Sequence, residues 1–95
     1  MREKLYNIPP SDKAFNEMKE KSVELFREIY PGDDDYINSK IWAIKKLKNI
    51  GDNFMFIFSL FDIWNKRKLL SKLSNETKEE VKKRLGSYYL KLLNL

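Results

Sequence analysis

Residues 53–64 read NFMFIFSLFDIW, and the way this apolar stretch is accommodated decides the fold of the whole chain. A membrane-spanning helix needs about 20 apolar residues to cross about 30 Å of hydrocarbon. Phe54 to Trp64 would make only roughly 16 Å of helix, at about 1.5 Å for each residue. The stretch is therefore too short to span a bilayer. We expect a helix in the middle of a helical domain, capped by Asp52 or Asn53 and buried on nearly all sides.

The apolar face of this helix changes direction downstream. Leu69, Leu70 and Leu73 project toward the side that carries Asp62 and Lys66, which form an i,i+4 ion pair in a continuous helix. A straight helix cannot bury both faces against the same layer. We therefore expect a kink or break near Asn65. The alternative is that one of the two faces meets a partner.

Three further helices have recognisable ends. The first begins after Ser11 as N-cap and runs to about Tyr30, where Pro31 and Gly32 end it. The second opens at Asp33-Asp34-Asp35 and ends at Gly51, and the fourth begins after Ser74. A calcium loop is the alternative for DDDYINS, but it requires D-x-D-x-D with glycine at the sixth position, so we expect capping. Short connections predict a single all-α domain over residues 1–95, an antiparallel up-down-up-down four-helix bundle.

The spacing of apolar residues predicts which side of each helix faces the core. Trp42 points away from the core side of its helix, toward Lys45 and Lys46. Packing of Trp42 against a loop and binding of a partner by Trp42 are both open. The predicted core positions are Phe15, Met18, Ser22, Leu25, Phe26 and Ile29 in the first helix; Tyr36, Ile37, Ile41, Ala43, Ile44 and Leu47 in the second; and Val81, Leu85, Tyr88, Tyr89 and Leu92 in the fourth.

The composition argues against catalysis. The chain has no cysteine and no histidine, which removes thiolate chemistry, disulfides, the usual zinc sites and histidine acid–base catalysis. It also lacks a glycine-rich phosphate loop and a nucleophile elbow. We expect a protein that is not an enzyme, with no catalytic, metal or cofactor site. The N-terminus lacks the apolar run of a secretory signal, so we expect a cytoplasmic protein.

Charge is distributed unevenly along the chain. Residues 1–35 hold six Lys/Arg against nine Asp/Glu, and residues 36–95 hold thirteen against five, so the halves carry −3 and +8 and sum to +5. A basic half attracts nucleic acid or an anionic membrane face, or it pairs with the acidic half of the same chain. The predicted partner-binding residues are Trp42, Lys45, Lys46, Lys66, Arg67, Lys68, Lys72, Lys82, Lys83 and Arg84.

The order of these features resembles the immunity proteins that protect bacteria against pediocin-like (class IIa) bacteriocins. The resemblance lies in an acidic first helix ending in ELFREIYPGDDD, a second ending in KKLKNIGDN, an apolar third, and a fourth opening with LSNETKEEVKKRL. It implies a small antiparallel four-helix bundle that acts by binding. The implied partner is a membrane transporter of the mannose phosphotransferase type with bacteriocin bound, which the C-terminal half meets from the cytoplasmic side. The resemblance implies that seven basic residues face the transporter or membrane: Lys66, Arg67, Lys68, Lys72, Lys82, Lys83 and Arg84.

Two alternatives stay open. Basic runs also suit a small nucleic-acid-binding regulatory protein, because phosphate neutralisation dominates such affinity, although acidic Glu79 and Glu80 lie beside the last run. The other alternative is an adaptor bundle, in which a homodimer would bury the second apolar face of the third helix. We expect a monomer, with peripheral contact to an anionic membrane.

Overall fold

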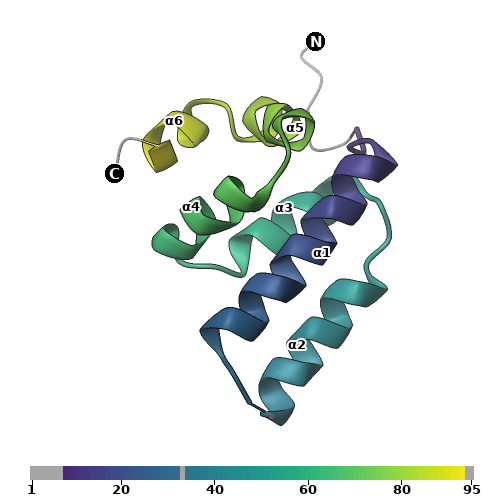
Figure 1. Ribbon diagram of the computed structural model, residues 1–95. Coiled ribbons are helices and arrows are strands. Elements are labelled where there is room, and N and C mark those ends of the chain that lie inside the picture. The colour runs from purple at the N-terminus through teal and green to yellow at the C-terminus, as the bar shows by residue number, and fades with distance from the viewer. Residues whose placement is uncertain (1–7, 33, 94–95) are drawn as a thin grey trace.

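The computed structural model describes residues 8–32 and 34–93, and the regular elements in these two segments are all α-helices (Figure 1). The prediction of an all-α chain is confirmed. The finer prediction of an up-down-up-down four-helix bundle is not confirmed, because the described segments form six helices. They are α1 (Asp12–Ile29), α2 (Asp35–Lys46), α3 (Gly51–Ser59), α4 (Ile63–Lys72), α5 (Asn75–Leu85) and α6 (Ser87–Leu93).

Helix α1 is the centre of the fold, since α2, α3, α4 and α5 all pack against it, while α6 packs on α4 and α5. Ser11 caps its N-terminus, as predicted, by accepting a hydrogen bond of 3.2 Å from the backbone N–H of Ala14. The predicted core face is also confirmed. Its members Phe15, Met18, Ser22, Leu25 and Phe26 are buried, and Ile29 is partly buried against the core.

Helix α2 begins as predicted but ends earlier than Gly51. Asp34 is its N-cap and accepts from the backbone N–H of Tyr36 at 2.8 Å; the companion prediction for Asp33 lies outside the described residues. The helix stops at Lys46, and Gly51 begins α3 instead of ending α2. A long-range contact accounts for this, because Lys19 Nζ donates to the free carbonyl of Leu47 at 2.8 Å.

The predicted third helix is two helices, α3 and α4, separated by residues 60–62. A kink or break was expected near Asn65, and the break lies three to five residues upstream of it. Asp62 caps α4 there by accepting from the backbone N–H of Asn65 at 2.9 Å. Asp62 therefore does not serve as the i,i+4 partner of Lys66 that a continuous helix implied. Phe61 lies in the break, and its ring packs against that of Phe26 with centroids 4.9 Å apart.

The break lets both apolar faces reach one core. Phe54, Ile57 and Phe58 of α3 are buried, and so are Leu69 and Leu70 of α4. The N-cap of α3 is Ile50, which makes no side-chain cap hydrogen bond, so the predicted cap at Asp52 or Asn53 is wrong by two or three positions. The prediction that this stretch is buried on nearly all sides is wrong at Phe56 and Trp64, which are exposed.

The predicted fourth helix is likewise divided, into α5 and α6. Gly86 adopts φ +58°, a conformation that favours glycine, and this turn separates the two helices. Of the predicted core face, Val81 and Leu92 are buried and Leu85 and Tyr89 are partly buried, whereas Tyr88 is exposed. In α2, Ile37, Ile41 and Ile44 are buried as predicted, Ala43 and Leu47 are partly buried, and Tyr36 is exposed.

The carboxylate of Glu17 in α1 anchors the first turn of α5. Ser74 donates to it through its backbone N–H and through its hydroxyl (2.8 Å), and Thr77 Oγ1 donates at 2.7 Å. Ser74 is also the N-cap of α5, as predicted. Burial by itself raises the pKa of Glu17, but the hydrogen bonds from Ser74 and Thr77 outweigh it and hold the pKa below its ordinary value of 4.5.

Within residues 8–32 and 34–93, no helix combines the length and the apolar character that crossing a membrane requires. The molecule measures 47 × 30 × 20 Å along its principal axes. Its longest lobe is the α1–α2 hairpin, and α4, α5 and α6 gather at the other end (Figure 1). This arrangement separates the outer side of α2 from the C-terminal helices.

Replacing Leu25 tests the central role of α1. We expect Leu25→Ala to lower the free energy of unfolding by about 2–5 kcal/mol, because the side chain is fully buried and its removal leaves a cavity beneath several helices. Leu90→Ala is the matched control, and its cost should stay within about 0.5 kcal/mol because Leu90 is exposed. Urea unfolding followed by circular dichroism measures both, and equal costs would contradict the assignment.

Replacing Glu17 tests the anchor of α5. We expect Glu17→Gln to lower the free energy of unfolding at pH 7 by about 1 kcal/mol, because hydrogen bonds to a charged acceptor are stronger. Since the folded pKa lies below 4.5, the charged form contributes stability above that pH and loses it as the pH falls through the folded pKa. Urea curves of the wild type and the variant should therefore converge in acid.

The matched control for this pair is Glu20→Gln, a substitution on the exposed side of the same helix. Its effect should stay within about 0.5 kcal/mol at neutral pH. A gap between wild type and Glu17→Gln that is the same at neutral and strongly acidic pH would show that the charge of Glu17 is not the stabilising feature.

Candidate partner-binding groove

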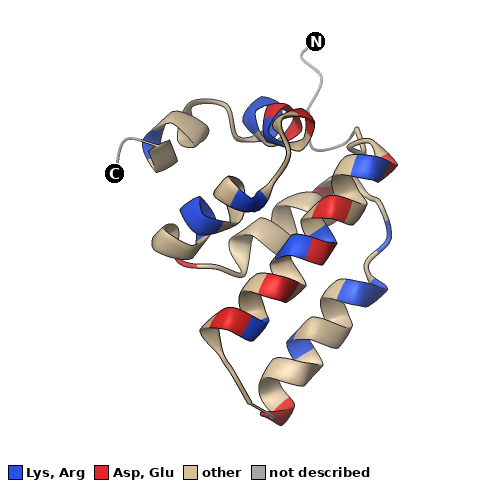
Figure 2. Ribbon diagram, viewed as in Figure 1, with Lys and Arg blue, Asp and Glu red and all other residues tan. Residues whose placement is uncertain are grey.

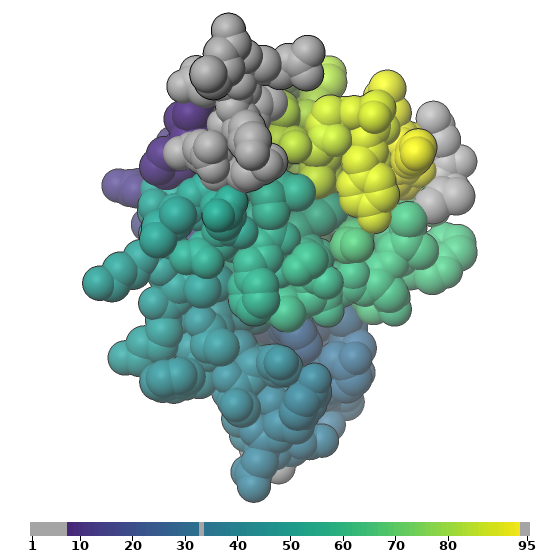
Figure 3. Space-filling model, turned by 180° about the vertical axis from the view of Figure 1, so that it is seen from behind, coloured from purple at the N-terminus to yellow at the C-terminus, as the bar shows by residue number. Residues whose placement is uncertain are grey.

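A groove of about 510 Å³ lies between α4, α5 and α6, and we call it the C-terminal groove. Figure 3 shows the outer surfaces of α4 and α6 next to each other at one edge of the molecule. Its size lies in the range that suits a lipid chain, a small ligand or the anchoring side chains of a partner. The lining residues are Trp64, Arg67, Lys68, Leu70 and Ser71 of α4, Lys78 of α5, and Tyr89 and Leu93 of α6.

One face of α4 forms the longest wall of the groove. Trp64, Arg67, Lys68 and Ser71 recur at i, i+3, i+4 and i+7, so they share one side of the helix. The indole of Trp64 is 70% exposed, and the guanidinium carbon of Arg67 lies 5.4 Å from its ring centroid. This wall therefore pairs a large aromatic surface with a cation.

Helix α6 forms the apolar side of the groove. Tyr89 is partly buried against the core, and Leu93 is 52% exposed, with Leu90 beside it 55% exposed. Tyr88 is not a lining residue of the groove, and Lys66 Nζ donates to its hydroxyl at 3.3 Å and lies 5.6 Å from its ring centroid. A second aromatic–cation pair thus joins α4 to α6.

The charge of the groove is of one sign. Arg67, Lys68 and Lys78 line it, and no Asp or Glu is among its lining residues. Neither α4 nor α6 contains an acidic residue, whereas α1 carries both signs (Figure 2). In a groove with partly apolar walls, such cations attract anionic groups more strongly than they would on an open surface.

Two of the predicted binding residues are held by an acidic residue of α1. Glu28 lies 2.6 Å from Lys72 Nζ and 3.6 Å from Lys68 Nζ. The hydrogen bond from Lys72 lowers the pKa of Glu28, and the same bond raises the pKa of Lys72. Lys72 therefore fastens α4 to α1, and Lys68 serves both the ion pair and the groove.

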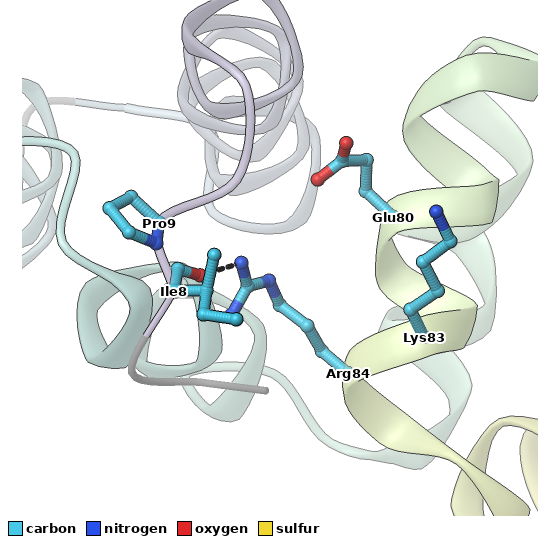
Figure 4. A pocket seen from close by; sticks show the side chains of 5 residues that line it. All are labelled: Ile8, Pro9, Glu80, Lys83 and Arg84. Carbon is cyan, nitrogen blue, oxygen red and sulfur yellow. Dashed lines mark hydrogen bonds between the residues drawn. The ribbon is translucent and has the colours of Figure 1, made fainter. Parts of the chain in front are cut away.

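The predicted binding residues of α5, Lys82, Lys83 and Arg84, do not line the groove. Arg84 donates to the carbonyl of Ile8 and lies 5.5 Å from the ring centroid of Phe54, and burial lowers its pKa (Figure 4). It thereby holds the segment before α1 against α5. Lys83 and Lys82 are exposed, and Lys83 borders a separate hollow of about 250 Å³ with Arg84.

The predicted binding residues of α2 form a second, separate surface. Trp42 is 63% exposed on the outer side of α2, so its predicted direction is confirmed, and Lys46 Nζ lies 5.6 Å from its ring centroid. Lys45 is exposed nearby. Helices α2 and α4 lie on different sides of α1 (Figure 1), so the structure does not bring Trp42 together with the groove.

Six groove residues were not among the predicted binding residues: Trp64, Leu70, Ser71, Lys78, Tyr89 and Leu93. Trp64 was assigned to a buried helix and Tyr89 to the core. The i, i+3, i+4, i+7 spacing of Trp64, Arg67, Lys68 and Ser71 is a signal that could have placed the indole on an exposed basic face. Lys78 and Leu93 carry no such local signal.

In the described part of the chain, no three Asp or Glu side chains gather where they could hold a metal ion. Comparison of the chain with protein-family models, with characterised proteins and with solved structures finds no match. The candidate site therefore stands on its own geometry. Its aromatic, aliphatic and cationic groups are suited to binding an amphipathic anionic partner.

Single-tryptophan variants test the geometry of the two surfaces. In Trp42→Phe the remaining reporter is Trp64, and in Trp64→Phe it is Trp42. We expect both to emit near the wavelength of free tryptophan and to be quenched readily by acrylamide, because both indoles are mostly exposed. Emission at short wavelength from Trp64 in the isolated protein would contradict the open groove.

Proposed function

We propose that this protein is a non-enzymatic binding protein of the bacteriocin-immunity type. In this proposal it works at the cytoplasmic face of the membrane and binds a mannose phosphotransferase-type transporter that a bacteriocin occupies. The C-terminal groove is the surface that meets this assembly. The observation that carries the proposal is a groove that joins exposed Trp64 with Arg67 and Lys78 and has no acidic lining residue.

The location of the groove supports the proposal, because it lies in the half of the chain to which the resemblance assigns target recognition. Large aromatic and arginine side chains also dominate the energy of many protein interfaces. Trp64 and Arg67 are such residues, and both are available at the surface. Binding without turnover needs no group beyond these.

The six-helix arrangement limits what the resemblance supports. Its helix-end residues occur where expected at Ser11, Asp34 and Ser74, whereas the breaks at residues 60–62 and at Gly86 depart from four continuous helices. The proposal therefore depends on the surface of α4–α6, not on the topology of a bundle.

Bacteriocin challenge tests the proposed function. We expect expression of the chain in a sensitive strain to protect it against one or more peptides in a panel of class IIa bacteriocins. Arg67→Gln with Lys78→Gln should weaken that protection at least tenfold in bacteriocin dose, because each substitution removes a groove cation worth about 1 kcal/mol or more at a charged surface.

The charge-matched control is Arg27→Gln with Lys40→Gln, which removes one arginine and one lysine from α1 and α2, outside the groove. This variant should protect as well as the wild type. Full sensitivity to every peptide, with the protein present and folded in the cells, would remove the proposed function.

A further inference from the structure

We infer that the C-terminal groove docks directly onto an anionic lipid bilayer, with α4 and α6 turned toward the membrane. This inference rests on the proposed function in one respect, since it places the protein where a membrane transporter is found. It goes further by naming lipid as the substance that the groove touches.

The wall of the groove carries an aromatic–cation pair of a kind that suits the membrane interface. Trp64 lies beside Arg67, and both line the groove. Tryptophan and tyrosine concentrate at the level of the lipid headgroups, where an apolar ring meets polar groups, and the neighbouring cations reach the phosphates. The pair of Trp64 and Arg67 therefore supplies both contacts that a headgroup layer offers.

Exposed aliphatic side chains add to this surface. Leu90 and Leu93 of α6 are more than half exposed, and Lys91 stands between them in sequence and is also exposed. Exposure of leucine side chains to water is unfavourable, and insertion just below the headgroups relieves this cost. The floor of the groove, which includes Leu70 and Tyr89, continues the apolar surface inward.

The charge on this face selects an anionic partner and opposes self-association. Arg67, Lys68 and Lys78 line the groove, so a second copy packed on it would place like charges opposite one another. Of the acidic residues of α5, Glu76 pairs with Lys13 at 3.2 Å and Glu80 lines the hollow beside Arg84 (Figure 4), while Glu79 is exposed and does not line the groove. Anionic headgroups attract clustered cations at the surface of a bilayer.

The exposed leucines favour lipid over nucleic acid. A nucleic acid would use the cations and could stack bases on Trp64, but it offers nothing to Leu90 and Leu93. A bilayer uses all three kinds of side chain at once. Because α6 has only seven residues, its exposed Leu90 and Leu93 do not form a long trough for a peptide helix.

Vesicle binding with single-tryptophan reporters tests the inference. With vesicles of phosphatidylglycerol and phosphatidylcholine, the emission of Trp64 in Trp42→Phe should shift to shorter wavelength and resist acrylamide. With phosphatidylcholine alone it should not change. The emission of Trp42 in Trp64→Phe should remain that of an exposed indole in both, because α2 lies on another side of α1.

Charge and apolar variants should separate the two contributions to binding. Arg67→Gln with Lys78→Gln should reduce partitioning onto anionic vesicles about thirtyfold, at about 1 kcal/mol for each cation near the surface, and Arg27→Gln with Lys40→Gln should reduce it much less. Leu90→Ser should weaken partitioning about tenfold while keeping its salt dependence, since it removes insertion and leaves the charge.

Four outcomes would overturn the inference. The first is an emission shift of Trp42 in place of Trp64, and the second is equal binding of the protein to neutral and anionic vesicles. The third is an equal loss of vesicle partitioning in the two charge variants. The fourth is a folded wild type that does not partition onto vesicles but binds an acidic peptide, an oligonucleotide or a second copy. Failure of bacteriocin protection together with the expected Trp64 shift would remove the proposed function alone. Protection without any vesicle binding would remove the lipid contact alone.

Discussion

The fold depends on burying two apolar faces that point in different directions along one stretch of chain. In a straight helix Leu70 would point away from Phe54 and Ile57, so large side chains would be left in water. The break at residues 60–62 removes the conflict, and Asp62 caps the new helix. The same break turns the outer side of α4, with Trp64, toward α6 and so creates the groove.

Local signals predicted the parts of the fold that local interactions determine. Ser11 and Ser74 were recognised as caps because a hydroxyl before a helix satisfies a nearby backbone N–H, whatever the rest of the chain does. Gly51 was misassigned because glycine suits both the end of one helix and the start of the next. The contact that ends α2, from Lys19 to the carbonyl of Leu47, spans 28 residues and leaves no local pattern.

The same distinction governs the candidate site. The clusters of lysine and arginine were visible in the sequence. Which of these cations form ion pairs within the protein, however, depends on residues far along the chain. Glu28 holds Lys72, and Glu17 holds the start of α5 at Ser74, 57 positions away. Part of the basic charge of the C-terminal half is therefore used to attach it to acidic α1. The cations that remain around the groove, Arg67 and Lys78 among them, are the ones that can serve a partner.

The difference between local and long-range contacts also applies to the resemblance to bacteriocin-immunity proteins. The segments that carry it, such as ELFREIYPGDDD and LSNETKEEVKKRL, form helix ends in the structure, and helix ends are specified by nearby residues. They say little about how helices pack, and here the chain breaks at residues 60–62 and at Gly86. A function shared with that family would therefore have to act through side chains on the surface of α4 and α6. Those side chains combine an indole, leucines and cations, so recognition at an anionic, partly apolar boundary is the step that both proposals require.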